Sequence, residues 1–184
     1  MLKRAWIWIR RCIHSRGFGV QSPNDYRFVR YVINEHYPYY AYKDMEERYP
    51  GEGWKFHKLG QLYFRLVNFV QPQSILNLNS TPLYDDYVRC GCRKAIFITE
   101  LTDSADLVFL NSSYVENLLQ RSFFENLHNG MMVVVEGIFE DKASRHFWQL
   151  LKEDSKVTIT YDLYYAGIAI LDNKRYKQHY IINF

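Results

Sequence analysis

The 184-residue chain has no apolar run that approaches the roughly 20 residues a transmembrane helix needs. The apolar stretch from Ala5 to Ile9 is too short for the core of a signal peptide. Strong charge of one sign is also missing, because the formal net charge is only +3, well below that of a dedicated nucleic-acid binder. We therefore expect a cytoplasmic protein that binds no nucleic acid.

Cysteine is scarce, and its pattern suits neither a disulfide framework nor a zinc site. The three cysteines are an odd number, and Cys90 and Cys92 are separated by one residue where structural zinc pairs usually have two to four. The six histidines form no pair with ligand spacing. The sequence therefore predicts reduced thiols and no metal site.

What the chain has in quantity is hydrophobic side chains, 48% of all residues against 23% charged ones. A chain of this length and composition can bury a sizeable core and is typical of one folded domain. We expect a single domain over residues 1–184, with a helical and tyrosine-rich extension over 1–57 and an α/β core over 58–184.

The first sixteen residues contain five basic residues and no acidic one. At helical spacing, one apolar face gathers Leu2, Trp6, Ile9 and Ile13. This face can dock on the protein's own core, which is the interpretation we favour. Contact of residues 2–13 with an anionic membrane surface is the lesser alternative.

The next segments contain one clear helix start and one long connection. Ser22 and Pro23 are typical of a helix cap followed by proline in the first turn. The stretch from His36 to Trp54 is rich in tyrosine and interrupted by proline and glycine, so it is interpreted as a connecting segment. Its tyrosines suit packing over a core better than an aromatic substrate groove.

From Lys58 onward, helical and strand-like patterns alternate. A helix over 58–70 leads into a buried strand over 74–79. Four further strand-like runs cover 95–99, 107–110, 132–136 and 157–163, and helix-like stretches cover 113–127 and 142–153. A final antiparallel hairpin is predicted from 157–163 and 168–171, with 178–184 as an edge strand. The pattern favours a Rossmann-like α/β sheet, mostly parallel, with a C-terminal hairpin.

The order of these elements resembles that of the class I S-adenosylmethionine-dependent methyltransferases from about Leu59 to the C-terminus. More narrowly, the chain resembles a bacterial branch with a segment of the kind HGxHSPF near the N-terminus, echoed by Phe18 to Pro23. The most specific likeness is at the end of the chain, where Lys177 to Phe184 (KQHYIINF) is similar to the branch's KQHxIIxF.

This resemblance implies an S-adenosylmethionine site at the ends of the strands, where the chain departs from the family pattern. The acidic residue of the first strand is Asn77 here, and the first glycine of the following turn is Asn79. Asparagine tolerates positive φ best among non-glycine residues, so we expect the turn to persist with Asn79 in that conformation. The candidate cofactor-binding residues implied by the resemblance are Asn77, Asn79, Ser80, Glu100 and Asn111.

A second departure follows Glu100, whose carboxylate stands where the family holds the cofactor's ribose. Only 101–105 separate it from the next strand, although parallel neighbours usually need a crossover of about a dozen residues. We therefore expect that one of these strands is antiparallel or that the sheet is rearranged, and that the family's third-strand region is lost. Without that region, Glu100 is better explained as a solvated carboxylate.

The remaining candidates are weak. Metal-dependent relatives place aspartates after two strands where this chain has Asn111 and Glu136, so no metal is expected. No catalytic residue can be assigned. The sequence favours a degenerate, non-catalytic methyltransferase-like scaffold that binds no S-adenosylmethionine and contacts an unknown protein partner or a second copy. The alternative is an active methyltransferase that uses S-adenosylmethionine and a small-molecule substrate through an altered site.

Overall fold

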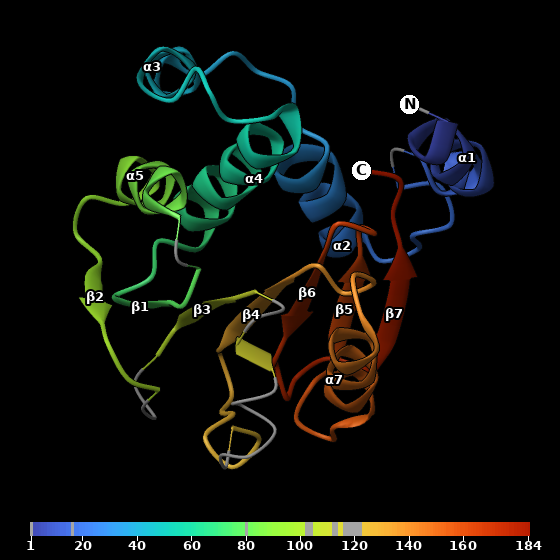
Figure 1. Ribbon diagram of the computed structural model, residues 1–184. Coiled ribbons are helices and arrows are strands. Elements are labelled where there is room, and N and C mark those ends of the chain that lie inside the picture. The colour runs from blue at the N-terminus through green and yellow to red at the C-terminus, as the bar shows by residue number, and fades with distance from the viewer. Residues whose placement is uncertain (1, 16, 80, 102–104, 112–113, 116–122) are drawn as a thin grey trace.

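The computed structural model describes residues 2–15, 17–79, 81–101, 105–111, 114–115 and 123–184. Its strands form one seven-stranded sheet in the order β2-β1-β3-β4-β6-β5-β7 (Figure 1). The strands are β1 (Ser74–Asn77), β2 (Ile96–Ile98), β3 (Leu107–Leu110), β4 (Met132–Glu136), β5 (Ile159–Asp162), β6 (Ala166–Ile170) and β7 (Gln178–Ile181). The α-helices are α1 (Leu2–Arg11), α2 (Pro23–Phe28), α3 (Tyr40–Arg48), α4 (Trp54–Val70), α5 (Pro82–Gly91) and α7 (Lys142–Glu153).

Four strands of the sheet, β2, β1, β3 and β4, run parallel to one another. Strand β6 is antiparallel to both of its neighbours, β4 and β5, and β7 pairs with β5 in parallel. The expected mixed sheet with a C-terminal antiparallel hairpin is therefore confirmed, and 178–181 adds the expected edge strand.

Alternation along the central strands produces two cores, one on each face of the sheet. On β1, Ile75 belongs to one buried cluster and Leu76 to the other, and on β3 Phe109 and Val108 divide in the same way. The first cluster contains the buried residues of α4 and α5, and the second those of α7. Both faces of the parallel strands are therefore covered, as their nearly continuous apolar sequences require.

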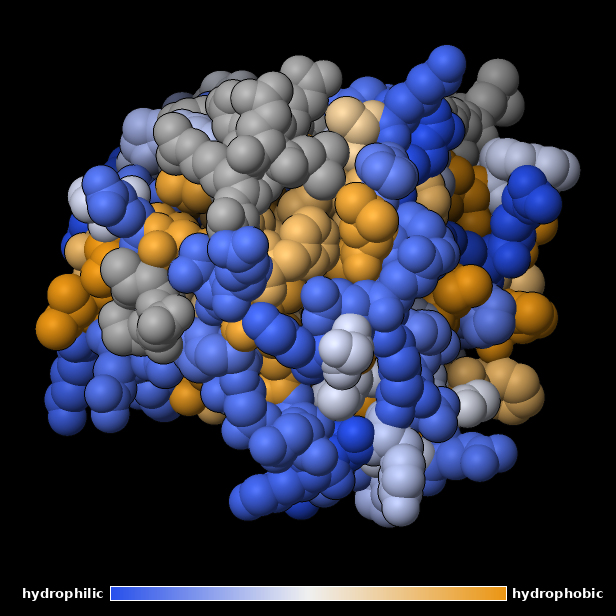
Figure 2. Space-filling view, turned by 90° about the horizontal axis from the view of Figure 1, so that it is seen from below, coloured by the Kyte–Doolittle hydropathy of each residue, from blue (hydrophilic) through white to orange (hydrophobic). Residues whose placement is uncertain are grey.

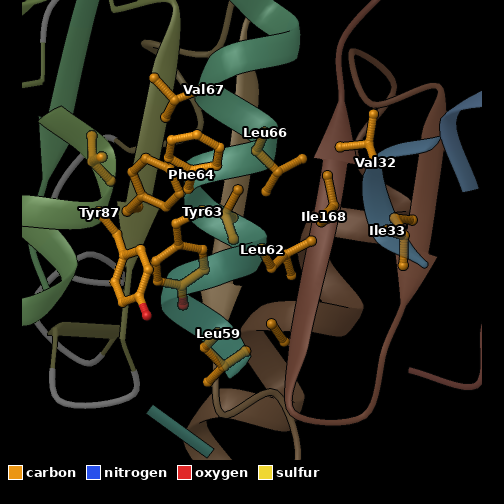
Figure 3. Close-up of a cluster of buried hydrophobic side chains, with 14 of the residues drawn as sticks. Val32, Ile33, Leu59, Leu62, Tyr63, Phe64, Leu66, Val67, Tyr87 and Ile168 are labelled. Atoms are coloured by element: carbon orange, nitrogen blue, oxygen red, sulfur yellow. The ribbon is translucent and has the colours of Figure 1, made fainter. Parts of the chain in front are cut away.

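Helix α4 is the central element of the first core. Its apolar residues recur at helical spacing, and Leu62, Tyr63 and Leu66 are completely buried. Figure 3 shows these side chains directed from α4 toward Tyr87 of α5 on one side and Ile168 of β6 on the other. Helix α4 thus packs between α5 and β6, which are distant in sequence, and places Tyr63 close to the sheet.

The helical segment before α4 is held against the core by the buried Arg65 side chain of α4. Helix α2 begins as expected, with Ser22 accepting a hydrogen bond from the amide of Asp25 over 3.3 Å, and it continues into a π-helix, Val29–Ile33. The guanidinium of buried Arg65 donates to the carbonyls of Val32 (2.6 Å) and Ile33 (3.1 Å). Because these carbonyls end the helix, Arg65 satisfies acceptors that lack helical partners.

The stretch 36–54 is more ordered than the sequence suggested, because it contains α3. The sequence from Ala41 to Arg48 consists mostly of good helix formers, which the neighbouring prolines and glycines obscured. Tyr42 and Met45 are buried, whereas Tyr37 and Tyr40 are exposed. The prediction of a purely connecting segment was wrong, and the expected packing role holds for only part of the tyrosines.

The prediction that 101–105 is too short to join two parallel strands was also wrong, because β2 and β3 are both parallel to β1 and lie on its opposite sides. Strand β2 has three residues and β3 has four, so the chain needs to return only about 10 Å along the strands. Because β2 ends at Ile98 and β3 begins at Leu107, the connection has the length of residues 99–106, and a connection of this length can span more than about 20 Å. Along the chain, no further strand occurs between β2 and β3 in the described residues, which agrees with the expected loss of the third-strand region.

Helix α1 lies at the periphery of the molecule, beside the C-terminal end of the chain (Figure 1). It is followed by a 3-10 helix, Cys12–His14, and a bridge between Ser15 and Asn183. A groove of about 1360 Å³, lined in part by Ile7, Trp8, Tyr31 and Tyr165, separates α1 from the body. The favoured interpretation, that the apolar face of α1 docks on the core, was therefore wrong.

No helix in the described part of the chain is long and apolar enough to cross a bilayer. Figure 2 shows one face of the molecule, on which hydrophilic side chains predominate and hydrophobic ones appear as separate patches among them.

Candidate functional site

The candidate site lies at the carboxyl ends of β1, β3 and β4, which the parallel register brings to one edge of the sheet. Asn77 pairs with Phe109, and Leu110 pairs with Val135. Asn77, Asn111 and Glu136 thus occupy the ends of three adjacent strands. Ligands of open α/β sheets usually bind at this edge.

The Glu136 carboxylate is a buried polar group at this edge. Tyr63 of α4 donates its hydroxyl to Oε2 and Tyr84 of α5 donates its hydroxyl to Oε1, each over 3.2 Å. The two tyrosine rings pack edge to face, with their centroids 4.9 Å apart. Both oxygens of Glu136 are therefore engaged by side chains from the helices that cover the sheet.

A lysine and a second carboxylate lie next to Glu136. Lys55 Nζ is 3.8 Å from Glu136 Oε1 and 2.7 Å from Glu140 Oε1. The Glu140 side chain approaches the backbone of Gly137 so closely that a Cβ at residue 137 would lie 2.8 Å from the carboxylate. Gly137 also has φ +75°, a conformation that favours glycine. The chain consequently turns back directly after β4.

Burial raises the pKa of Glu136 above its usual value. The Lys55 charge and the two tyrosine hydrogen bonds oppose this shift but do not cancel it. Burial also raises the pKa of Tyr63 and of Tyr84, and the Glu136 charge adds to both shifts. The tyrosines are therefore hydrogen-bond donors in the neutral form, not bases.

Asn77 is committed to the turn that follows β1. Its Nδ2 donates to Oδ1 of Asp85 over 2.6 Å, and its Oδ1 accepts from the backbone amide of Asn79 over 3.1 Å. Asparagine commonly forms such a bond to the amide two residues ahead. Both polar atoms of the Asn77 side chain, which stands at the family's acidic position, are thus hydrogen-bonded within the protein.

Asn79 is the residue that most alters the expected cofactor turn. It is only 4% exposed, and among the described residues neither its side-chain nitrogen nor its side-chain oxygen has a hydrogen-bond partner. In the described residues, the non-glycine residues with positive φ are Gln71 and Tyr164. The expected positive φ at Asn79 was therefore wrong, because the turn forms through the Asn77 side chain.

Three candidate residues remain, Glu100, Asn111 and Ser80. Glu100 is exposed, two residues beyond the end of the edge strand β2. Asn111 directly follows β3, is partly buried, and accepts a hydrogen bond from the Tyr114 amide through its carbonyl over 3.1 Å. Ser80 lies outside the described residues. The structure thus brings Asn77, Asn79 and Asn111 to one edge and leaves Glu100 at the sheet's margin.

Sequence analysis gave the two tyrosines no role at the site, because each lies in an apolar helical stripe. A sign was available in the combination of tyrosines on two core helices with a carboxylate at a strand end. In the described residues, no group of three or more histidine, cysteine, aspartate or glutamate side chains is placed to hold a metal.

These residues do not fit S-adenosylmethionine in the manner of the family. A buried side chain occupies the position of the first glycine, and the amide at the acidic position is already paired. Of the candidate residues that the structure describes, Glu100 alone offers an exposed carboxylate near a strand end, as ribose binding would need.

No family model matches this sequence, and no curated protein matches it. A solved structure does resemble it, the crystal structure of the SAH-bound methyltransferase PaMTH1 from Podospora anserina. The TM-score is 0.51 at 12% sequence identity, and the match covers 84% of this chain and 97% of the other. At this identity the likeness concerns the fold, which is that of a methyltransferase.

Proposed function

We propose that this chain is a degenerate relative of the bacterial class I methyltransferases that transfers no methyl group and acts as a binding or regulatory scaffold. The observation that carries the proposal is the engagement of both Glu136 oxygens by Tyr63 and Tyr84. Two aromatic side chains from α4 and α5 thereby reach the carboxyl end of β4. A carboxylate in this position would otherwise be free to contact a ligand.

The turn after β1 supports the same proposal. A cofactor's carboxylate needs close approach to backbone amides at this place, which glycine permits and a side chain obstructs. Asn79 is buried there, and Pro82 removes one amide from the start of α5. Both changes weaken an anion site at the helix N-terminus.

One observation favours a second candidate, an active small-molecule methyltransferase with an altered site. Buried polar atoms normally have partners, and the side-chain amide of Asn79 has none in the part of the chain that the structure describes. A polar ligand at the end of β1 would satisfy it. Glu100 remains available for a ribose in that case.

Thermal unfolding with S-adenosylmethionine and with its demethylated product distinguishes the two candidates. A ligand at about 100 times its Kd adds roughly 2.7 kcal/mol, which corresponds to about 5–10 °C for a chain of this size. The scaffold proposal predicts no shift at millimolar ligand. The PaMTH1 protein, measured in parallel, shows that the ligands and the assay respond.

A shift of several degrees would contradict the scaffold proposal. In that case Asn79→Ala tests the second candidate, because it removes the unpaired amide and should abolish the shift. A shift that survives Asn79→Ala would place the ligand elsewhere on the chain.

A further inference from the structure

The apolar face of α1 points to a partner outside the chain. On one side of the helix, Trp6 is 61% exposed and Ile9 56%, and Ile13 in the following turn is 64% exposed. Large apolar side chains gathered this closely on a monomer's surface indicate an interaction site. The helix therefore carries a face that nothing in the described residues covers.

The charge of the same segment restricts the kind of partner. Residues 1–24 contain five basic residues and no acidic one, so the rest of the chain is slightly acidic. Arg10 is exposed next to the apolar face, with its guanidinium 5.8 Å from the centre of the Trp6 ring. The partner that matches this face is both apolar and negatively charged.

The attachment of α1 keeps this face turned outward. Arg11 donates to Oδ1 of Asp162 over 2.8 Å and to the Asp162 carbonyl over 3.1 Å, so the last turn of the helix is tied to the end of β5. Ile7, one turn before Arg11, is partly buried on the same side. Trp6 and Ile9 lie on the opposite side of the helix.

We infer that α1 binds the surface of an anionic phospholipid bilayer, with Trp6, Ile9 and Ile13 inserted at the level of the headgroups. Tryptophan is favoured at this depth because its ring is apolar and its N–H is polar. Basic residues beside it gain from the negative surface potential of the bilayer. Helices of this kind lie in the plane of the interface and do not cross it.

A second copy of the chain fits this face less well. Pairing two α1 helices would bring two clusters of basic residues together without an acidic residue in either segment to offset them. The helix has only ten residues, about 15 Å, which offers little area to a stable dimer. The inference is independent of whether the chain transfers methyl groups.

Sedimentation of the full chain with lipid vesicles tests this inference. Vesicles of phosphatidylcholine with about one third phosphatidylglycerol should bind the protein, and vesicles of phosphatidylcholine alone should bind it at least about tenfold more weakly. Trp6→Ala combined with Ile9→Ala, called the tryptophan variant below, should weaken binding by about tenfold or more. Arg10→Glu should weaken it about fivefold or more.

Matched variants separate these effects from general surface changes. Tyr40→Ala with Tyr176→Ala removes two other exposed aromatic residues, and Arg93→Glu reverses another exposed basic residue. Neither should alter vesicle binding. Unchanged thermal unfolding of the tryptophan variant in the absence of lipid shows that the fold is intact, because neither side chain belongs to the core.

Three results would overturn the inference. The first is no binding to the anionic vesicles, and the second is equal binding to both kinds of vesicle. The third is binding that the tryptophan and Arg10 variants leave unchanged. A dimer in solution that the tryptophan variant converts to a monomer would assign this face to a second copy instead.

Discussion

The hydroxyl of Tyr63 donates a 3.2 Å hydrogen bond to Oε2 of Glu136, joining the middle of α4 to the last residue of β4. Tyr63 is completely buried and Glu136 nearly so. This contact links the helix layer to the edge of the sheet where the methyltransferase fold usually binds its cofactor. Tyr84 completes the arrangement from α5.

Removing the Tyr63 hydroxyl should destabilise the protein without altering its fold. In Tyr63→Phe, one buried oxygen of Glu136 loses its donor, which typically costs about 1.5–3 kcal/mol when the acceptor is charged. Urea unfolding at neutral pH measures the loss. Tyr176→Phe, at a 90% exposed position, is the control and should change stability by less than about 0.5 kcal/mol. Equal stability of the two variants would contradict the role of the contact.

The raised pKa of Glu136 predicts a specific pH dependence. The folded state holds this proton more tightly than the unfolded state, whose pKa is near the ordinary value of 4.5. The stabilisation that comes from the protonated Glu136 side chain is therefore fully present below pH 4.5 and is lost as the pH rises through the pKa of the folded state. Glu136→Gln removes this titration, so its stability relative to wild type should increase as the pH is raised from about 4 to 7.

Urea unfolding of both proteins across this pH range gives the comparison. Glu47→Gln, which neutralises an exposed carboxylate on α3, should show no such trend. A stability difference between Glu136→Gln and wild type that stays constant with pH would refute the prediction.

Asp25 should have the opposite pH behaviour. Burial raises the pKa of Asp25, but hydrogen bonds from Arg175 and Tyr161 outweigh it and leave the pKa below the usual 3.8. Its stabilisation is present above the unfolded pKa and is lost as the pH falls through the lower folded pKa. Asp25→Asn should therefore cost about 2–3 kcal/mol at pH near 7, with a smaller difference below about pH 4.

Chemical denaturation of wild type and Asp25→Asn at several pH values tests this. Asp44→Asn, at an exposed position on α3, is the control and should stay close to wild type throughout. A variant as stable as wild type at neutral pH would show that the bonds to Asp25 contribute little.

Gly60 should be intolerant of even one added carbon atom. A Cβ at this position would lie 2.2 Å from the Tyr87 ring, so α4 and α5 approach each other closely only because residue 60 has no side chain. Gly60→Ala should cost about 1–3 kcal/mol through overpacking, despite the better helix propensity of alanine. Gly51→Ala, where a Cβ meets nothing within 4 Å, should be neutral or slightly stabilising in the same thermal unfolding experiment.

Much of the fold could be predicted from the sequence, because its signals are local. The apolar runs at 107–110 and 132–136 became β3 and β4, and the pattern at 142–153 became α7 with the same bounds. The direction of β2 could not be predicted in this way. The typical length of a parallel crossover assumes strands of ordinary length, and β2 has only three residues.

The candidate site was likewise only partly predictable from the sequence. The sequence alone identified Asn77, Asn79 and Asn111 as strand-end residues, since strand ends follow from local patterns. It did not pair Glu136 with Tyr63 and Tyr84, because that contact joins α4, α5 and β4 through side-chain ends that no periodicity encodes.

By itself, the sequence determined the order of the strands, the apolar face of α1 and the absence of glycine in the turn after β1. Only the tertiary structure decided that Asn79 lies buried with no hydrogen-bond partner among the described residues, and that the apolar face of α1 stays exposed. The physical reason is that hydrophobic periodicity specifies which face of an element avoids water. Which neighbour covers that face depends on contacts between segments far apart in the chain, such as Arg11 and Asp162.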